Sequence, residues 1–303
     1  MRFFDRVWKV TIFRSTGAAL TPSSPGGAVD LNPLAVDHAT ALEITEMRIK
    51  GSIEKKLIKN PNTCALTIFN LAERTRSFLK ERPLTAKIEA GHDGILRHLY
   101  LGDIRFADSD LKDETWETKL VIKDGGRAFA GGFITKSYSK NTPVRTIVRD
   151  CAGAMGLQLP AQLESNADLS AGIPRGVTLD GPAEHHLTEL LAPYGFGWSL
   201  QNGILQTLRE DQVRDNEAFI VNEDDAALIG SPEYKVPQKE GQPNLLQFKT
   251  LLWPELQPGS KVDMRTLAVR GLHKLVMVKH DFDSDSEDEW VTACEATIFT
   301  GAA

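Results

Sequence analysis

Alternating apolar and polar positions predict β-strands through most of the first 125 residues. Val10 and Ile12 alternate with Lys9 and Thr11 in segment 7–14, where β-branched residues are frequent. Partial alternation follows over 41–56. A turn at 60–62 precedes a further strand over 62–71. Three more strands are expected at 84–94, 96–111 and 114–126, separated by His92-Asp93-Gly94 and by the charged segment 108–114.

One short helix interrupts these strands. In segment 72–82, Ala72, Arg76 and Leu79 follow helical spacing, and Pro83 ends the pattern. Six strands with one short helix predict a small barrel or sandwich of about 125 residues. Segment 15–40 is rich in Gly, Pro, Ser and Ala. It is interpreted either as a loop or as an arm that orders against a neighbouring subunit.

The middle of the chain changes to helical spacing. Val144, Ile147 and Val148 form one apolar stripe in a helix expected over 143–156. A second helix is expected over 181–195. An Asn-Gly pair between two apolar segments then predicts a β-hairpin over 197–208. Residues 126–215 are therefore expected to form a small α+β domain.

The last third returns to strands. Five strand-like segments are separated by turns rich in Pro and Gly, and they lie at 236–239, 245–254, 260–269, 272–282 and 289–299. The predicted fold class is mainly β with a small α+β portion. The expected domains are 1–125 and 216–303, both β, flanking 126–215. No short repeat supports a solenoid or a propeller.

Composition narrows the class of protein. The chain has 303 residues, 41% hydrophobic and 25% charged, and a formal net charge of −6. These values are typical of an ordered globular protein. Three cysteines leave at least one without a disulfide partner, and their spacing does not suit a zinc knuckle. Charged residues interrupt the apolar N-terminus, so no signal peptide is expected. No apolar run approaches the ~18 residues needed to span a bilayer.

Two groups of residues could bind a metal ion, and neither pattern is convincing. His185 and His186 are adjacent on a predicted helix and face different directions, unlike a chelating pair spaced by four residues. The acidic run 281–289 begins like a calcium loop, with Asp281, Asp283 and Asp285. However, its sixth and twelfth positions hold Ser286 and Thr292 in place of Gly and Glu. A solvated acidic hairpin tip is the preferred interpretation.

Other catalytic motifs are absent from the sequence. Glycine pairs at 125–126 and 131–132 flank Arg127, but they do not form a phosphate-binding motif. There is no nucleophile elbow and no zinc-protease motif. We therefore predict no catalytic, cofactor-binding or metal-binding residues, no cofactor and no enzyme. Trp116, Trp198, Trp253 and Trp290 are interpreted as core or interface anchors.

An ordered set of short segments resembles the central baseplate hub proteins of contractile-tailed bacteriophages, a family of tube-to-spike adapters. The set includes NTCALTIFNL, WETKLVIKDGG, GFGWSLQNGIL and LLWPELQPG. Its members lie at 62–71, 88–92, 101–104, 116–126, 195–205, 227–233, 251–259 and 278–292. The resemblance spans most of residues 40–300. In two of these segments, Gly230 with Pro232 and Gly259 with Pro258 are suited to fixed turns.

The resemblance implies two tube-type β-barrel domains in each chain and a homotrimer. Three copies would match the six-fold tail tube, or a tube-initiator ring, to the trimeric central spike. The expected partners are these proteins and other baseplate proteins, with DNA only passing through the channel at ejection. The expected location is the virion tail baseplate, after synthesis in the bacterial host cytoplasm.

Two other classes of function stay open at this point. One is a tail-associated hydrolase of peptidoglycan or peptide, for which the residues of 281–285 and His185/His186 are the only candidates. The other is a carbohydrate- or peptide-binding β module on a cell surface. The hub of a phage-derived tailocin or injection device cannot be distinguished by sequence from a phage hub.

Overall fold

The computed structural model describes most of the chain. The described residues are 5–14, 41–81, 83–157, 163, 167–215, 217–223, 228–235, 244–286 and 288–301. The predicted loop or arm at 15–40 and the predicted strand at 236–239 lie outside these residues. Among the described residues, no helix is both long and apolar enough to cross a membrane.

The first part of the chain forms β-strands with one short helix, as the alternation predicts. The helix α1 (Glu73–Phe78) is shorter than expected, because its last turn ends at Leu79. The strands are β1 (Val7–Arg14), β2 (Leu42–Ile44), β3 (Ile49–Lys56), β4 (Thr63–Phe69), β5 (Leu84–His92), β6 (Ile95–Lys112) and β7 (Thr115–Lys123). They pair in the order β3-β4-β7-β6-β5-β1-β2, and each pair is antiparallel.

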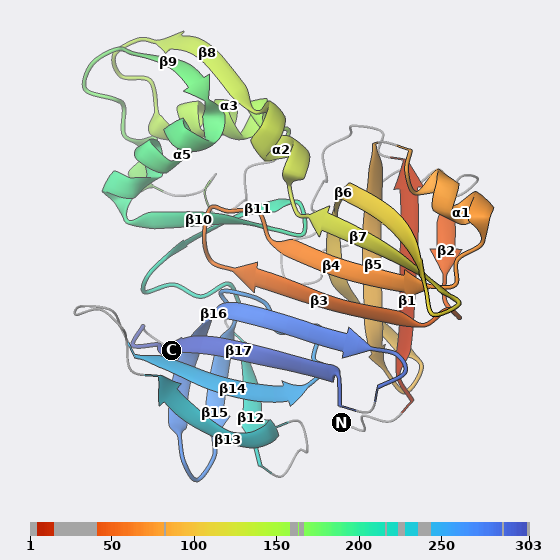
Figure 1. Cartoon of the computed structure of the whole chain (residues 1–303). Helices are drawn as coiled ribbons and strands as arrows, with labels where there is room; N and C mark the ends of the chain where they lie inside the picture. The colour runs from red at the N-terminus through yellow and green to blue at the C-terminus, as the bar shows by residue number, and fades with distance from the viewer. Residues whose placement is uncertain are drawn as a thin grey trace.

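This part of the sheet bends around its own core. Strands β1 and β5 run across the direction of β3 and β4 (Figure 1). Val10 and Ile88 from the first pair belong to the same buried cluster as Ile53, Leu66 and Ile122. Since successive side chains of a strand point to opposite faces, the alternate apolar positions bury one face of the sheet and leave the other outward.

The middle portion contains the helices and two small antiparallel sheets. Both predicted helices are confirmed, as α3 (Val144–Ala154) and α5 (Ala183–Leu191). The other elements are α2 (Gly126–Gly131), β8 (Phe133–Tyr138), the 3-10 turns η1 (Asp168–Ser170) and η2 (Ala192–Tyr194), β9 (Val177–Pro182), β10 (Phe196–Gln201) and β11 (Ile204–Arg209). Strand β8 pairs with β9, and β10 pairs with β11.

The predicted β10–β11 hairpin is also confirmed. Asn202 and Gly203 connect its strands with φ angles of 57° and 80°. Positive φ at both central residues is the mirror-image turn that suits the twist of a two-residue hairpin. Ile147, Leu187 and Leu200 belong to a second buried cluster, which holds α3, α5 and this hairpin together.

The last part of the chain adds strands to the first sheet. They are β12 (Ala218–Asn222), β13 (Leu228–Lys235), β14 (Leu245–Leu251), β15 (Lys261–Arg265), β16 (Arg270–Asp283) and β17 (Trp290–Ile298). Strand β16 pairs with β3, so one sheet runs through both β portions in the order β13-β14-β17-β16-β3-β4-β7-β6. A third buried cluster includes Val262, Val278 and Cys294. The fold class predicted from sequence, mainly β with a small α+β portion, is confirmed.

One local expectation was wrong. Gly230 and Pro232 were expected in a fixed turn, but they lie inside β13. Gly230 does have the expected positive φ, of 72°, and the register shifts between Ile229 and Glu233. The unusual backbone angle therefore produces an irregularity within a strand. Gly259, in contrast, lies between strands with φ of 92°, as expected of a turn.

Candidate assembly surfaces

The two histidines of α5 differ in environment but lie close together. The side chain of His185 is 63% exposed and that of His186 is 14% exposed. Their ring centroids are 5.9 Å apart, and His185 Nε2 and His186 Nδ1 lie 3.3 and 3.7 Å from the Glu189 carboxylate oxygens. Across the part of the chain that the structure describes, no group of three His, Cys, Asp or Glu side chains could hold a metal ion.

The acidic segment between β16 and β17 is a hairpin tip, but it is not solvated throughout. The side chain of Asp283 is 2% exposed and pairs with Arg48 at 2.9 Å. Its Oδ1 also accepts the Asp285 backbone N–H. Burial is the largest single influence on the pKa of Asp283 and would raise it. The hydrogen bonds from Arg48 and from the Asp285 N–H, together with the charges of Arg48 and Lys50, outweigh burial and lower this pKa. The expectation of a solvated tip is therefore wrong for Asp283, which joins β16 to the start of β3.

Cysteines and tryptophans are mainly structural. Cys64, Cys151 and Cys294 are buried free thiols, and burial raises the pKa of each. Buried thiols of raised pKa have little thiolate at neutral pH, so they are poor nucleophiles. Trp198 and Trp290 lie in the cores. Trp253 packs against Phe219. The guanidinium carbon of Arg76 lies 3.6 Å from the centroid of the Trp116 ring.

Asp124 anchors the middle portion to the first β portion. This fully buried residue follows β7, and its carboxylate accepts the backbone N–H groups of Asn202 and Gly203 at 2.5 and 2.6 Å. Burial raises the pKa of Asp124 to about 6, although the two N–H groups act in the opposite direction. A Cβ at Gly125 would lie 2.2 Å from Leu200 Cδ1. The glycine therefore allows the hairpin tip to approach Asp124 closely.

Lys55 lies at the same junction and faces inward from β3. It is fully buried, and its Nζ donates to Leu99 O at 2.5 Å and to Gln257 Oε1 at 2.8 Å. Burial lowers the pKa of Lys55 to about 7, despite the opposing charge of Asp124. Gln257 belongs to the loop after β14, so Lys55 connects the two β portions. The sequence analysis missed this residue, although its position in phase with Ile53 is an inward one.

Further buried polar contacts complete the junction. The Asn62 side-chain amide donates to Leu200 O at 2.7 Å and to Gln201 Oε1 at 3.0 Å. Tyr100 donates its hydroxyl proton to Asn62 O at 2.8 Å and accepts the Asp124 backbone N–H at 2.9 Å. Buried polar groups with satisfied hydrogen bonds favour one arrangement over others. The three portions are thus joined by specific contacts.

The outward face of the continuous sheet is polar, and its charges are paired along β3 and β16. Basic and acidic side chains alternate along the outward side of β3 and of β16. Lys56 Nζ lies 2.6 Å from the Glu54 carboxylate, and Lys279 Nζ lies 2.9 Å from the Asp281 carboxylate. On β14 and β17, Gln247 donates to Glu295 at 2.7 Å. The charges of Glu54 and Asp281 are therefore paired, whereas the Gln247 amide is neutral and leaves the charge of Glu295 unbalanced.

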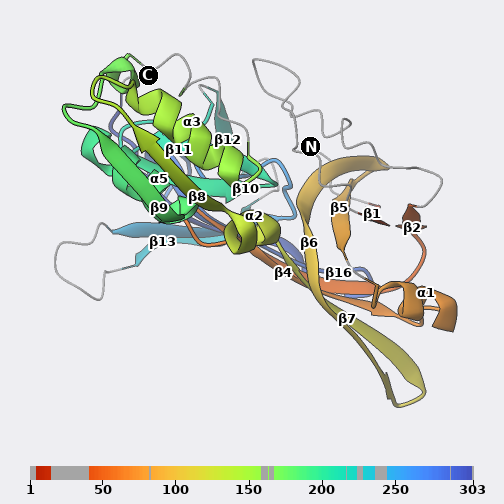
Figure 2. The ribbon, with the colours of Figure 1, turned by 90° about the horizontal axis from the view of Figure 1, so that it is seen from above.

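Two edges of this sheet are unpaired among the described strands, one along part of β6 and one along β13. Strand β5 pairs with β6 only up to Asp103, so the rest of β6 pairs with β7 alone. That part forms a hairpin that extends beyond the body of the molecule (Figure 2). Strand β13 pairs only with β14. Apolar side chains are exposed near both edges, namely Phe106 and Leu111 at one and Ile229 and Tyr234 at the other. Unpaired edges accept strands of other chains.

Comparisons with known proteins show the fold. No protein-family model and no curated protein matches this sequence. Among solved structures, a 43 kDa tail protein of prophage MuSo2 from Shewanella oneidensis is similar with a TM-score of 0.62 and 9% identity, over 85% of this chain and 94% of that one. A tail protein from Neisseria meningitidis MC58 is similar with a TM-score of 0.60 and 10% identity, over 97% of each chain.

A third structure comes from a different kind of particle. It is an E. coli protein described as a component of the type VI secretion system, with structural similarity to bacteriophage T4 tail proteins. The TM-score is 0.57 and the identity 11%, over 84% of this chain and 75% of that one. This chain therefore has the fold of phage tail proteins, and the resemblance noted from its sequence segments agrees with that fold.

Proposed function

We propose that this chain is a structural hub of a phage tail baseplate, located in the virion after synthesis in the host cytoplasm. The single observation that carries the proposal is the continuous sheet. It crosses from one β portion to the other through the β3–β16 pair, and it has unpaired edges along β13 and along the part of β6 beyond Asp103. The fold shared with phage tail proteins supports the same function. The role requires no catalytic group and no cofactor.

The proposed assembly is a homotrimer. We assign a tube-type domain to 1–125, an α+β domain to 126–215 and a second tube-type domain to 216–303. Two of the buried clusters fall within 126–215 and 216–303, and the third lies mostly in 1–125 but also includes Leu252, Phe282 and Trp290. Three chains with two such β domains each present six similar units around a three-fold axis. A ring of this kind would match a six-fold tail tube on one side and a trimeric spike on the other, among the other baseplate proteins.

Contacts between copies would run head to tail. The free part of the β6 edge in one copy and the β13 edge in the next lie on opposite sides of the β3–β16 pair, as a heterologous closed ring requires. The outward face of β3, β16 and β17 would then line the channel. The paired charges on β3 and β16 suit a surface that DNA crosses without binding, because affinity for DNA depends on excess cations that neutralise phosphates.

The proposal is tested by a charged substitution at one edge. Phe106 and Phe133 are both exposed, at 49% and 61%, but only Phe106 lies on the β6–β7 hairpin. Phe106→Glu is expected to prevent trimer formation with the spike, and Phe133→Glu is expected to preserve it. Mass measurement of each mixture checks this. A trimer that forms normally with Phe106→Glu would contradict the assigned edge.

A second candidate is the same role in a phage-derived injection device. The type VI secretion component of similar fold favours this possibility. In both settings the chain would connect a tube to a spike, and only the cargo of the channel differs. The hydrolase alternative has no support from an assembled metal-binding group within the described ranges.

A further inference from the structure

The turn of the β10–β11 hairpin carries a chemically labile pair of residues. Asn202 and Gly203 form this turn, and they are the only Asn-Gly pair in the sequence. Asparagine loses its side-chain amide most readily before glycine, because glycine has no Cβ to hinder the backbone nitrogen that attacks the side chain. Unless the fold protects the turn, Asn202 therefore loses its amide nitrogen as ammonia over time.

The Asp124 carboxylate holds the atoms that would react. The Gly203 N–H donates to Asp124 Oδ1 at 2.6 Å, and the Asn202 N–H donates to Asp124 Oδ2 at 2.5 Å. Asp124 is fully buried, and the side-chain oxygen of Asn202, Oδ1, is buried as well. Hydrogen bonds to a charged acceptor away from water are strong. The nucleophile of the labile pair is therefore already engaged.

Deamidation requires the proton that Asp124 accepts. The Gly203 nitrogen would form a bond to Asn202 Cγ while the Cγ–Nδ2 bond breaks, and the Gly203 proton would leave with Nδ2 as ammonia. One water then opens the cyclic imide to aspartate or isoaspartate. In the docked turn, loss of that proton would place a negative charge beside the carboxylate, and the attack would place another on the buried Asn202 Oδ1. Both charges disfavour the reaction.

We propose that Asn202 is a deamidation site which Asp124 protects, and that it reacts only when the tip of the hairpin leaves the Asp124 carboxylate. The product carries a new carboxylate or, as isoaspartate, an additional methylene in the backbone. A second carboxylate cannot share the buried site of Asp124 without a large cost, and an altered backbone cannot present both N–H groups to it. An opening that ends in reaction thus removes the anchor of the α+β portion permanently.

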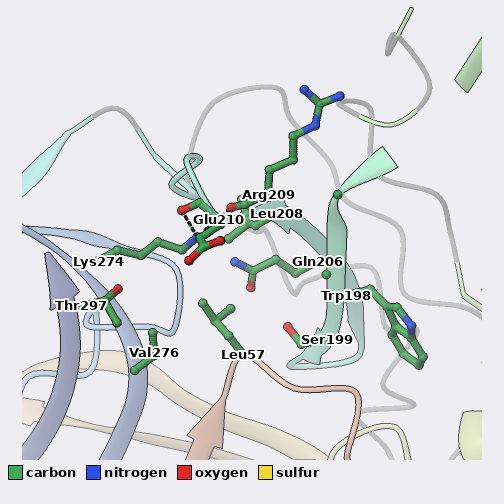
Figure 3. A pocket seen from close by; sticks show the side chains of 12 residues that line it. Leu57, Trp198, Ser199, Gln206, Leu208, Arg209, Glu210, Lys274, Val276 and Thr297 are labelled. Atoms are coloured by element: carbon green, nitrogen blue, oxygen red, sulfur yellow. Dashed lines mark hydrogen bonds between the residues drawn. The ribbon is translucent and has the colours of Figure 1, made fainter. Parts of the chain in front are cut away.

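The surroundings of the hairpin let its tip open without unfolding of the whole chain. A cavity of about 320 Å³ separates one face of the hairpin from the ends of β16 and β17 (Figure 3). On the β10 wall, a Cβ added at Gly195 or Gly197 would contact nothing closer than 3.6 Å. Lys274 Nζ donates to Arg209 O at 2.8 Å and holds the opposite end of the hairpin. On the side of the cavity, little packing therefore resists a movement of the tip.

Peptide mapping by mass spectrometry tests the proposal, because it quantifies aspartate and isoaspartate formed from Asn202 in the full chain at pH 8. The chain denatured in guanidinium chloride gives the unprotected rate. Folded wild type should react at least about 100-fold more slowly, since two hydrogen bonds to a charged acceptor must break first. Asp124→Ala should raise the folded rate at least about tenfold. Asp283→Asn removes a buried pair outside the hairpin and should leave the rate within about twofold of wild type.

A second measurement on wild type needs no variant. Hydrogen exchange of the Gly203 amide reports the fraction of molecules in which its bond to Asp124 is open. The folded deamidation rate should equal the denatured rate multiplied by this fraction. The effect of the product is tested with Asn202→Asp, which should lower the melting temperature. Asn141→Asp is the matched control at another turn with positive φ, of 67°, and should not lower it.

Four results would overturn the inference. Equal rates in the folded and the denatured chain would show that the fold gives no protection. An unchanged or slower rate in a folded Asp124→Ala variant would show that Asp124 does not protect Asn202. If that variant does not fold, a wild-type rate far above the value from hydrogen exchange would contradict the opening step. An Asn202→Asp variant as stable as wild type would contradict the loss of the anchor. The inference concerns a single chain, so none of these results bears on the trimer.

Discussion

The carboxylate of Asp124 accepts the backbone N–H of Gly203 at 2.6 Å. This contact joins the end of β7 to the tip of the β10–β11 hairpin, in a position that water does not reach. The same carboxylate accepts the neighbouring N–H of Asn202. The position of the α+β portion on the β sheet therefore depends on one buried side chain, with Asn62 and Tyr100 around it.

Replacing Asp124 with Ala should lower the free energy of unfolding by about 2–4 kcal/mol, because two buried N–H groups lose their acceptor. Urea unfolding at pH 7 measures the change. Asp180→Ala is the matched control, since Asp180 is exposed and accepts only a surface hydrogen bond from Thr135. The free energy of unfolding of this control should lie within about 0.5 kcal/mol of the wild-type value. Equal losses in the two variants would show that Asp124 does not anchor the hairpin.

Lys55 should make the free energy of unfolding depend on pH. Its pKa is about 7 in the folded chain and 10.5 in an unperturbed lysine. Between these values the unfolded chain holds a proton that the folded chain has released, so stability rises with pH. The stability of wild type relative to Lys55→Met should therefore increase between pH 7 and 9, by at most ~1.4 kcal/mol per pH unit. A pH-independent difference would mean that Lys55 stays protonated when buried.

We expect the Arg48–Asp283 pair to stabilise the fold, whereas the exposed acidic residue beside it should contribute little. Asp283→Asn removes a buried charge partner and should cost about 1–3 kcal/mol at pH 7. The pKa of Asp283 is lowered on folding, so its contribution is present above the unfolded pKa and is lost as pH falls below about 4. Asp285 has a side chain that is 68% exposed, and Asp285→Asn should change little.

Thermal unfolding of the Asp283 and Asp285 variants across pH 3–7 checks this prediction. The same experiment tests for a calcium site, because a ligand that binds only the folded chain raises its melting temperature. We expect no calcium-dependent rise for wild type, since Arg48 and Lys50 already lie beside the Asp283 carboxylate. A clear rise would restore the calcium-loop interpretation.

Two adjacent residues of β7 should differ in whether the fold tolerates their replacement by lysine. Ile122 is fully buried, whereas Val121 is 36% exposed on the outward face. Ile122→Lys places an unpaired charge in the first core and should prevent folding, and with it particle assembly. Val121→Lys should fold with a near-wild-type melting temperature. Soluble expression and circular dichroism distinguish the two variants, and normal particle yield with Ile122→Lys would contradict the assigned face.

Local structure was largely predictable from sequence, whereas long-range pairing was not. The strands at 7–14 and 62–71, both helices and the Asn202-Gly203 hairpin follow from periodicity and turn chemistry. Strands β8, β9 and β12 were missed because they are short and lie among Gly- and Pro-containing segments. The β3–β16 pair joins segments more than 200 residues apart, and nothing local specifies such a pairing.

The candidate surfaces were less predictable than the fold. In the sequence, Asp124 is only one of many charged residues near a strand end, and its contact with Gly203 depends on how two distant hairpins meet. Lys55 occupies an inward position of β3, where the alternation would place an apolar residue. A charged residue at such a position indicates a buried charge. The cavity beside β10 is formed by Gly195 and Gly197, and an absent side chain gives no pattern in a sequence.

The mass of the purified chain, alone and mixed with the trimeric spike protein of the same particle, tests the hub proposal most directly. The proposal predicts a trimer, or a complex of three chains with three spike chains. It also predicts that Phe106→Glu prevents this complex and that Phe133→Glu does not. A chain that stays monomeric in the presence of the spike would contradict the proposed function.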